Sequence, residues 1–345
     1  MPSAPNLPAP LRIGVDLGGT KIEAVVLRID DAPPADAAPA DAALAVATTA
    51  TPELPATSPP REHPTLLARQ RRPTERDLGY EHILATTAQL VRDVAAEAGI
   101  ARPADVRIGV GMPGSVSRVR GTVKNSNTTC LNGRPFRDDL RRRLGADIAF
   151  SNDANCFALA EARFGAGRGG EVVFGAILGT GVGGGIALRE HAGAAPRTWD
   201  GPQGIAGEWG HITLDPERGA PCYCGRRGCI ETLLCGPALE ARYRARAGTA
   251  LPLREIAARA GKDPHADAVL DEAAASFGRA VSVIINLLDP DVIVLGGGVS
   301  HLPCFYDEGR RHAARWVFND ELLTPIVKHQ IGDSAGVIGA ALLMP

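Results

Sequence analysis

The chain has 345 residues, of which 45% are hydrophobic and 22% are charged, and its formal net charge is −2. At roughly 150 residues per domain, this length predicts two domains. The near-neutral charge, and the lack of a basic stretch interleaved with aromatic residues, argue against binding to nucleic acid or to anionic membranes.

The N-terminal residues MPSAPNLPAP contain no basic segment followed by an apolar stretch, so no secretory signal is predicted. No run reaches the roughly 20 apolar residues that a membrane helix requires. The seven Cys residues are an odd number, and three of them fall within the segment CYCGRRGC, which suits a metal better than disulfides. We therefore expect a cytoplasmic protein.

The first predicted element is a β-hairpin over residues 12–29, where apolar runs flank the turn Gly-Gly-Thr. Residues 31–60 are almost entirely Ala, Pro, Thr and Asp, and they predict a flexible insertion without a core. Apolar residues at helical spacing predict a helix from Glu81 to a capping Gly99. A strand over VRIGVGMPG follows, and this alternation favours an α/β layered architecture.

The second half of the chain has a similar order of elements. The segment ADIAFSNDANCFALAEARF predicts a strand, a polar cap and a helix, and EVVFGAILGTGVGGGIALRE predicts two strands around a Gly turn. Residues 265–288 predict one long helix, PDVIVLGGGVS a strand that ends in glycines, and GVIGAALLM a short helix. Because both halves open with a strand, a Gly turn and a strand, at Asp16 and at Gly179, the sequence indicates a duplicated α/β unit.

Three glycine-rich turns are candidates for phosphate binding, because exposed backbone N–H groups attract anions. They are DLGGTK at 16–21, GTGVGGG at 179–185 and GGG at 296–298. The first is not a P-loop, because its Thr precedes its Lys, and the second has dinucleotide-binding spacing but precedes a strand instead of a helix. Each could be an ordinary tight turn, but two Gly-Thr hairpins together suit the β- and γ-phosphates of ATP.

Asp153 lies in SNDANCFALAE, between a predicted strand and a predicted helix. One interpretation is a helix cap, a position where Asn and Asp are favoured. The other is a catalytic base, because a helix N-terminus keeps a carboxylate ionised, and phosphoryl transfer needs a carboxylate to orient the attacking hydroxyl and accept its proton. The two interpretations differ in whether a substrate hydroxyl reaches Asp153.

A cysteine-rich patch has the pattern H-x10-C-x-C-x4-C. One His and three thiolates match the tetrahedral ligand set of structural zinc, whereas buried free thiols are the alternative. With four protein ligands the site is closed, so zinc would be structural and would not activate water. The predicted ligands are His211, Cys222, Cys224 and Cys229.

Together these motifs resemble those of the ROK family of sugar kinases, which belong to the actin-like ATPase class. The motifs are DLGGTK, GMPG, NDAN, GTGVGGG, GEWGH, CYCGRRGCIE and DPDVIVLGGG, in the family's order between Ile13 and Leu343. The resemblance implies a two-domain α/β fold, a duplicated ribonuclease H-like unit with a zinc-binding knot. The smaller domain would comprise residues 1–126 and 330–345, and the larger one, with the zinc site, residues 127–329.

The resemblance also implies roles for single residues. Asp153 would be the catalytic base, and His211 would use one ring nitrogen for zinc and the other for a sugar hydroxyl. Glu208 and Glu231 would line the sugar pocket, although the common place of Glu is the surface. The implied sugar-binding residues are Asn127, Asn152, Glu208, His211 and Glu231. The implied nucleotide-binding residues are Asp16, Gly18, Gly19, Thr20, Lys21, Gly179, Thr180, Gly181, Gly183, Gly296, Gly297 and Gly298.

Within the family, the segments GSVSRVRGTVKNSN, AGEWGH and PCYCGRRGCIET are similar to those of bacterial manno(fructo)kinases, a subgroup in which Trp209 is typical. This implies a fructokinase-type transfer from ATP to the 6-hydroxyl of fructose, with mannose as a second substrate. Mg²⁺ would be held mainly by the nucleotide, with Asp16 contributing through water. Cys130 stands where the subgroup usually has Trp, and Lys21 either stabilises the phosphates or is a solvated hairpin lysine.

Several alternatives accompany the fructokinase interpretation. Among enzymes, the alternative is a kinase for glucose or an N-acetylhexosamine. Outside enzymes, a sugar-responsive transcription factor of the family would need a helix-turn-helix domain ahead of Asp16, and a chaperone-type relative would need a peptide-binding domain. The resemblance also implies a homodimer, with no nucleic-acid or membrane partner.

Overall fold

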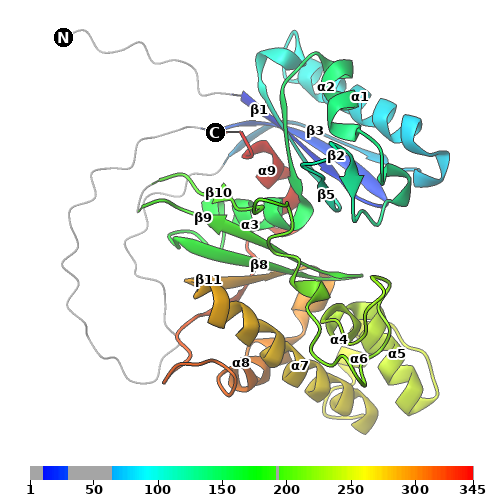
Figure 1. The fold of residues 1–345 in the computed structure, drawn as a ribbon, viewed down its shortest axis with the longest axis vertical. Helices are drawn as coiled ribbons and strands as arrows, with labels where there is room; N and C mark the ends of the chain where they lie inside the picture. Colours follow the sequence, from blue (N-terminus) through cyan, green and yellow to red (C-terminus); the bar gives the residue numbers. More distant parts are fainter. Residues whose placement is uncertain (1–10, 30–63, 192–193, 345) are drawn as a thin grey trace.

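The computed structural model describes residues 11–29, 64–191 and 194–344. Within them lie two five-stranded sheets that have the same strand order (Figure 1). In each sheet, three strands form an antiparallel meander, and two later strands add in parallel beside the first one. The predicted duplication is therefore present in the fold, whereas the predicted insertion at 31–60 lies outside the described residues.

The first sheet has the order β3-β2-β1-β4-β7, and a small sheet of β5 and β6 stands beside it. Two apolar runs that flank the turn Gly18-Gly19-Thr20 form the β1–β2 hairpin that the sequence predicts. The strands are β1 (Leu11–Leu17), β2 (Lys21–Arg28), β3 (Thr65–Pro73), β4 (Arg107–Met112), β5 (Ser115–Val116), β6 (Val123–Lys124) and β7 (Ile148–Asn152).

The second sheet has the order β10-β9-β8-β11-β12. Its strands β8 and β11 are buried along almost their whole length, as expected for strands covered on both faces. The strands are β8 (Val172–Leu178), β9 (Val182–Leu188), β10 (Arg197–Thr198), β11 (Val292–Gly296) and β12 (Ile326–Lys328).

Helices cover the outer face of each sheet and also separate the two sheets (Figure 1). Helices α1 and α2 pack on the first sheet, and α4 to α8 surround the far side of the second sheet. The helices are α1 (Tyr80–Glu97), α2 (Phe136–Leu144), α3 (Asp153–Phe164), α4 (Glu231–Leu234), α5 (Gly236–Ala247), α6 (Leu253–Ala258), α7 (Pro264–Leu288), α8 (Glu308–Ala313) and α9 (Ala335–Ala341).

Helices α3 and α9 lie between the two sheets and contact each other. Glycines allow this close approach: a Cβ added at Gly109 in β4 would lie 1.8 Å from the carbonyl oxygen of Ala340, and one at Gly339 would lie 1.7 Å from that of Cys156. Since α3 packs on the second sheet and α9 on the first, this pair of helices joins the two halves of the molecule.

The domain division needs an adjustment at its first boundary. Strand β7 pairs with β4 from Ile108↔Ile148 to Met112↔Asn152, so it completes the first sheet. The predicted boundary at residue 126 would separate β7 from its own sheet. We therefore propose that the first domain extends to Asn152.

No helix in the described part of the chain is long and apolar enough to cross a membrane.

Candidate active site

The turn between β7 and α3 carries Asp153 as the first residue of the helix. Asn152 is the helix cap, and its side-chain oxygen accepts a hydrogen bond from the Ala154 N–H at 2.9 Å. The Asp153 carboxylate accepts from the same N–H at 2.8 Å. Burial, opposed by this hydrogen bond and assisted by the charge of Glu208, raises the pKa of Asp153 to about 6.

A second half-buried carboxylate, Asp16, lies beside Asp153 near the end of β1. Burial raises the pKa of Asp16 to about 7, and the negative charges of Asp153 and Glu23 act in the same direction. The start of α9 packs against this side chain, because a Cβ added at Gly336 would lie 2.9 Å from Asp16 Oδ2. The first Gly loop therefore begins next to the predicted base.

Two further carboxylates extend this group toward the second Gly loop. Burial raises the pKa of Glu208, the negative charge of Glu231 adds to the effect, and His211 and Lys124 oppose it. Glu231 opens α4, and its carboxylate accepts the Val182 N–H at 3.0 Å. The acids Asp16, Asp153, Glu208 and Glu231 thus form a series of neighbours that links the two loops.

The second and third Gly loops lie side by side. Gly297 has φ +81°, and a Cβ there would lie 2.3 Å from the carbonyl oxygen of Leu178, the last residue of β8. The Gly179 carbonyl accepts the N–H of Gly236 at the start of α5 at 2.8 Å. These contacts bring the late glycines to the β8–β9 turn, as expected if both contact one nucleotide.

Lys21 is engaged within the first sheet. Its Nζ lies 3.5 Å from Glu23 Oε2, and Glu23 is only 1% exposed. Arg69 and Arg71 from β3 bind the same carboxylate at 2.7 and 2.9 Å. Lys21 thus belongs to a cluster of three cations around one acid, although its own side chain is 44% exposed.

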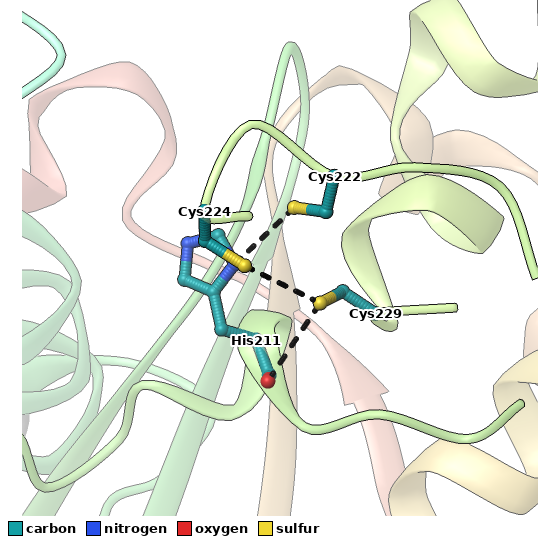
Figure 2. A group of neighbouring side chains, drawn as sticks. All are labelled: His211, Cys222, Cys224 and Cys229. Atoms are coloured by element: carbon teal, nitrogen blue, oxygen red, sulfur yellow. Dashed lines mark hydrogen bonds between the residues drawn. The ribbon is translucent and has the colours of Figure 1, made fainter. Parts of the chain in front are cut away.

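The cysteine patch folds into a compact cluster, shown in Figure 2. One ligand atom from each of the four residues lies within 4.8 Å of all the others. Cys224 Sγ and Cys229 Sγ are 3.6 Å apart, and His211 Nδ1 is 3.7 Å from Cys222 Sγ. Sulfur–sulfur separations of this size suit four ligands around one tetrahedral zinc ion, so the donor set fits the predicted metal.

The second ring nitrogen of His211 has a partner that the sequence did not suggest. Nε2 lies 2.9 Å from the hydroxyl of Tyr223, a residue that is 78% exposed. Tyr223 stands between the first two cysteines, and that place in the C-x-C motif is the only signal that could have singled it out. The predicted contact of this nitrogen with a sugar hydroxyl stays a prediction.

The other predicted residues occupy different environments. Asn127, Thr20 and Thr180 are exposed, on the loop after β6 and on the two Gly-Thr turns. Trp209 is 1% exposed, and its indole N–H donates to the Gly183 carbonyl at 2.7 Å, so it supports the second loop from within the core. Cys130 packs against the core of the first sheet.

A polar network beside the base was missed by the sequence reasoning. The carboxylate of Asp200 accepts hydrogen bonds from Ser151 and Asn155. Ser151 lies two residues before the predicted base Asp153, and Asn155 lies two residues after it. A cavity of 300 Å³ adjoins this network, and its lining includes Ser115, Ser151, Asn152 and Asp200. Asp200 stands in no motif, so the sequence offered no signal for it.

The comparisons with known proteins identify the family. A family model described as the ROK family matches residues 61–345. The chain belongs to the ROK family. It is 35% identical over 288 residues to the N-acetyl-D-glucosamine kinase of Pectobacterium atrosepticum, covering 79% of this chain and 90% of that protein. The family predicted from the motifs is therefore confirmed.

Two solved ROK structures confirm the predicted actin-like α/β fold. The ROK hexokinase from Thermus thermophilus is 30% identical, with a TM-score of 0.73 and coverage of 96% of this chain and 97% of that chain. The ROK family glucokinase from Streptomyces griseus, solved with glucose and AMPPNP, is 29% identical, with a TM-score of 0.67 and coverage of 96% and 98%.

Proposed function

We propose that this ROK protein transfers the γ-phosphoryl group of ATP to a hydroxyl of a hexose, with N-acetyl-D-glucosamine as the first candidate. The observation that carries the proposal is the series of half-buried acids between two Gly-Thr loops, with Asp153 at a helix N-terminus. The substrate choice rests on the relatives that are named N-acetyl-D-glucosamine kinases. This is the alternative that the sequence left open beside fructose.

In the proposed reaction, Asp153 orients the attacking hydroxyl and accepts its proton. A pKa near 6 leaves the carboxylate mostly ionised at neutral pH while keeping it a better base than an exposed Asp. Glu208, Glu231, His211, Asn127 and Asn152 would hold the other sugar hydroxyls, as the family resemblance implies.

The γ-phosphate would lie against the backbone N–H groups of the first two Gly loops, which stabilise charge that develops during transfer. Since Lys21 is paired with Glu23, we assign the stabilisation of the γ-phosphate to the loop N–H groups in preference to Lys21. Mg²⁺ would accompany the nucleotide and neutralise its phosphates, with Asp16 as the nearest candidate ligand through water. Zinc bound by the His-Cys₃ cluster would fix the loop that carries His211.

Fructose stays the second candidate because of the similarity to manno(fructo)kinases around Trp209. The structure weakens that argument, since Trp209 is buried against Phe174, with ring centroids 5.6 Å apart. A residue in this position shapes the second Gly loop and reports little about sugar contact. The homodimer also stays a prediction.

The proposal is tested by a coupled ADP-release assay with N-acetylglucosamine, N-acetylmannosamine, glucose, fructose and mannose. We expect the highest kcat/KM for N-acetylglucosamine. Asp153→Asn should lower kcat by about 10²–10⁴-fold, as loss of a general base does, while sugar binding measured by calorimetry persists. Asp138→Asn, an exposed carboxylate on α2, is the matched control and should keep full activity.

Three results would count against this assignment. ADP release that none of the five sugars stimulates would refute the kinase proposal. A preference for fructose would restore the fructokinase interpretation. Near-normal turnover in Asp153→Asn would remove Asp153 from the role of base.

A further inference from the structure

Asp200 lies just after β10, and its carboxylate is a convergence point for three side chains. Oδ1 accepts hydrogen bonds from the Ser151 hydroxyl and from Asn155 Nδ2, the latter at 3.0 Å. Oδ2 accepts from the Thr198 hydroxyl at 3.1 Å. Ser151 and Asn155 are 7% and 2% exposed, so these donors have little access to water as an alternative partner.

The two buried donors stand on either side of the predicted base. Ser151 is the second-last residue of strand β7 and Asn155 lies in the first turn of α3, each two residues from Asp153. The Asp153 carboxylate itself is held by the N–H of its neighbour Ala154. That bond orients the side chain within its own turn, but it does not fix the turn relative to the rest of the site.

Asn155 connects the same turn to the second sheet. While its Nδ2 donates to Asp200, its Oδ1 accepts the Ile186 N–H of β9 at 3.0 Å. The base-bearing turn, the Asp200 segment and β9 therefore meet at one buried amide side chain. An amide that uses both its donor and its acceptor in this way has a fixed orientation.

The segment that contains Asp200 also leads to Glu208, a predicted sugar-binding residue. The Asp200 carbonyl accepts the Ala206 N–H at 3.1 Å, which closes a compact loop. Gly207 follows with φ +89°, and a Cβ there would lie 2.3 Å from the Gly184 carbonyl of β9. The loop from Asp200 to Gly207 thus positions Glu208, and Asp200 itself is hydrogen-bonded to the β7–α3 turn that carries Asp153.

We propose that Asp200 is a positioning residue for phosphoryl transfer. It holds the β7–α3 turn that carries Asp153 and sets the position of this turn relative to the loop that carries Glu208. This inference rests on the proposed function. Asp200 acts through Ser151 and Asn155 and does not itself contact substrate. Replacement by Asn keeps the size but removes the negative charge, so the two bonds that Oδ1 accepts from Ser151 and Asn155 lose their charge assistance and become weaker.

The test compares Asp200→Asn, Ser151→Ala and Thr198→Val in the full chain, with ATP and the best sugar of the panel. Because small displacements of a reacting group are costly, we expect Asp200→Asn to lower kcat at least about 10-fold and Ser151→Ala about 3-fold. The KM for ATP should stay within about 2-fold of wild type, since no nucleotide loop is touched. Thr198→Val, which removes only the bond to Oδ2, is the matched control and should keep kcat.

Hydrogen exchange provides a readout that does not depend on activity. We expect the amides of residues 151–156 to exchange faster in Asp200→Asn than in Thr198→Val, while the amides of β11 stay unchanged. The proposal is overturned if Asp200→Asn keeps its kcat, if it leaves this exchange unaltered, or if all three variants lose activity only in proportion to their unfolded fraction. Should Asp200→Asn fail to fold, Ser151→Ala decides by the same criteria.

The two proposals fail in different ways. If the wild type phosphorylates no hexose, the kinase assignment fails, whereas the exchange experiment still tests the connection between Asp200 and the turn. If the wild type is active and Asp200→Asn keeps its kcat, only the positioning role is lost.

Discussion

At the scale of single residues, the cap and base interpretations of Asp153 do not exclude each other. Asn152 takes the cap position, and Asp153 follows it as the first helical residue while sharing the same Ala154 N–H. The helix N-terminus favours the ionised form, and burial opposes it. The balance raises the pKa to about 6, a value that suits a base working near neutral pH.

This pKa predicts an acid limb in the pH dependence of kcat/KM. The base acts when deprotonated, so activity is present above its pKa and lost as the pH falls through about 6, by up to tenfold per pH unit. Asp16, whose pKa is raised to about 7, titrates beside it, so the limb reports the pair and should be broadened.

The neighbouring charges allow a specific check of that limb. Glu208 raises the pKa of Asp153, so Glu208→Gln should move the acid limb to lower pH, whatever its effect on sugar KM. Glu217→Gln, an exposed carboxylate in the same region of the chain, should leave the limb in place. A limb that does not move in Glu208→Gln would show that another group controls it.

At the scale of elements, the cysteine knot over residues 211–229 contains little regular secondary structure. Two isolated β-bridges, Thr213↔Cys229 and Pro221↔Arg227, pair parts of this segment, and the four ligand atoms of the cluster come from the same segment. We expect a segment with so little regular secondary structure to gain stability from a bound metal, as small zinc motifs do. Because His211 is both a ligand candidate and a predicted sugar contact, the knot and the pocket should respond together.

Elemental analysis of the purified protein should therefore find about one zinc per chain, and a strong chelator should lower sugar affinity as well as thermal stability. Cys224→Ser should lose the metal. Cys304→Ser, outside the cluster and packed against the core of the second sheet, should retain it. Less than half an equivalent of zinc in wild type with unoxidised cysteines would contradict the four-ligand site.

At the scale of the whole molecule, the chain passes between the two sheets at two places, and Glu161 joins them. Helix α3 leads from β7 to β8, and residues 329–334 lead from β12 to α9. The Glu161 carboxylate, fully buried, accepts N–H groups from Ala166 at 2.8 Å, Ile331 at 2.9 Å and Gln330 at 3.1 Å. One side chain thus satisfies backbone donors from both passages.

Glu161→Gln should destabilise the protein by about 1–3 kcal/mol, because an amide N–H₂ would face backbone N–H groups that then lack an acceptor. The free energy of unfolding in urea measures this loss. Glu97→Gln, an exposed side chain on α1 that is hydrogen-bonded to Gln70, is the matched control. Equal stability of the two variants would mean that the junction does not depend on the charge.

Local patterns in the sequence determined the order of the elements, the family and the candidate metal ligands. The hairpin at 12–29, the helix now seen as α1 and the long helix α7 follow from periodicity and caps within a few turns of chain. The four zinc candidates follow from spacing over about twenty residues, and they do meet in space.

Only the tertiary structure decided which groups meet across the sheets. Asp200 reaches Ser151 and Asn155 over 49 and 45 residues, and Glu161 reaches Gln330 over 169. Strand β7 joins the first sheet although it follows the predicted boundary, and Trp209 is buried in the core around the second sheet. The sequence around a carboxylate does not reveal a hydrogen-bond partner that lies far away along the chain. That partner is determined by how the two sheets and the helices α3 and α9 pack, and not by local periodicity.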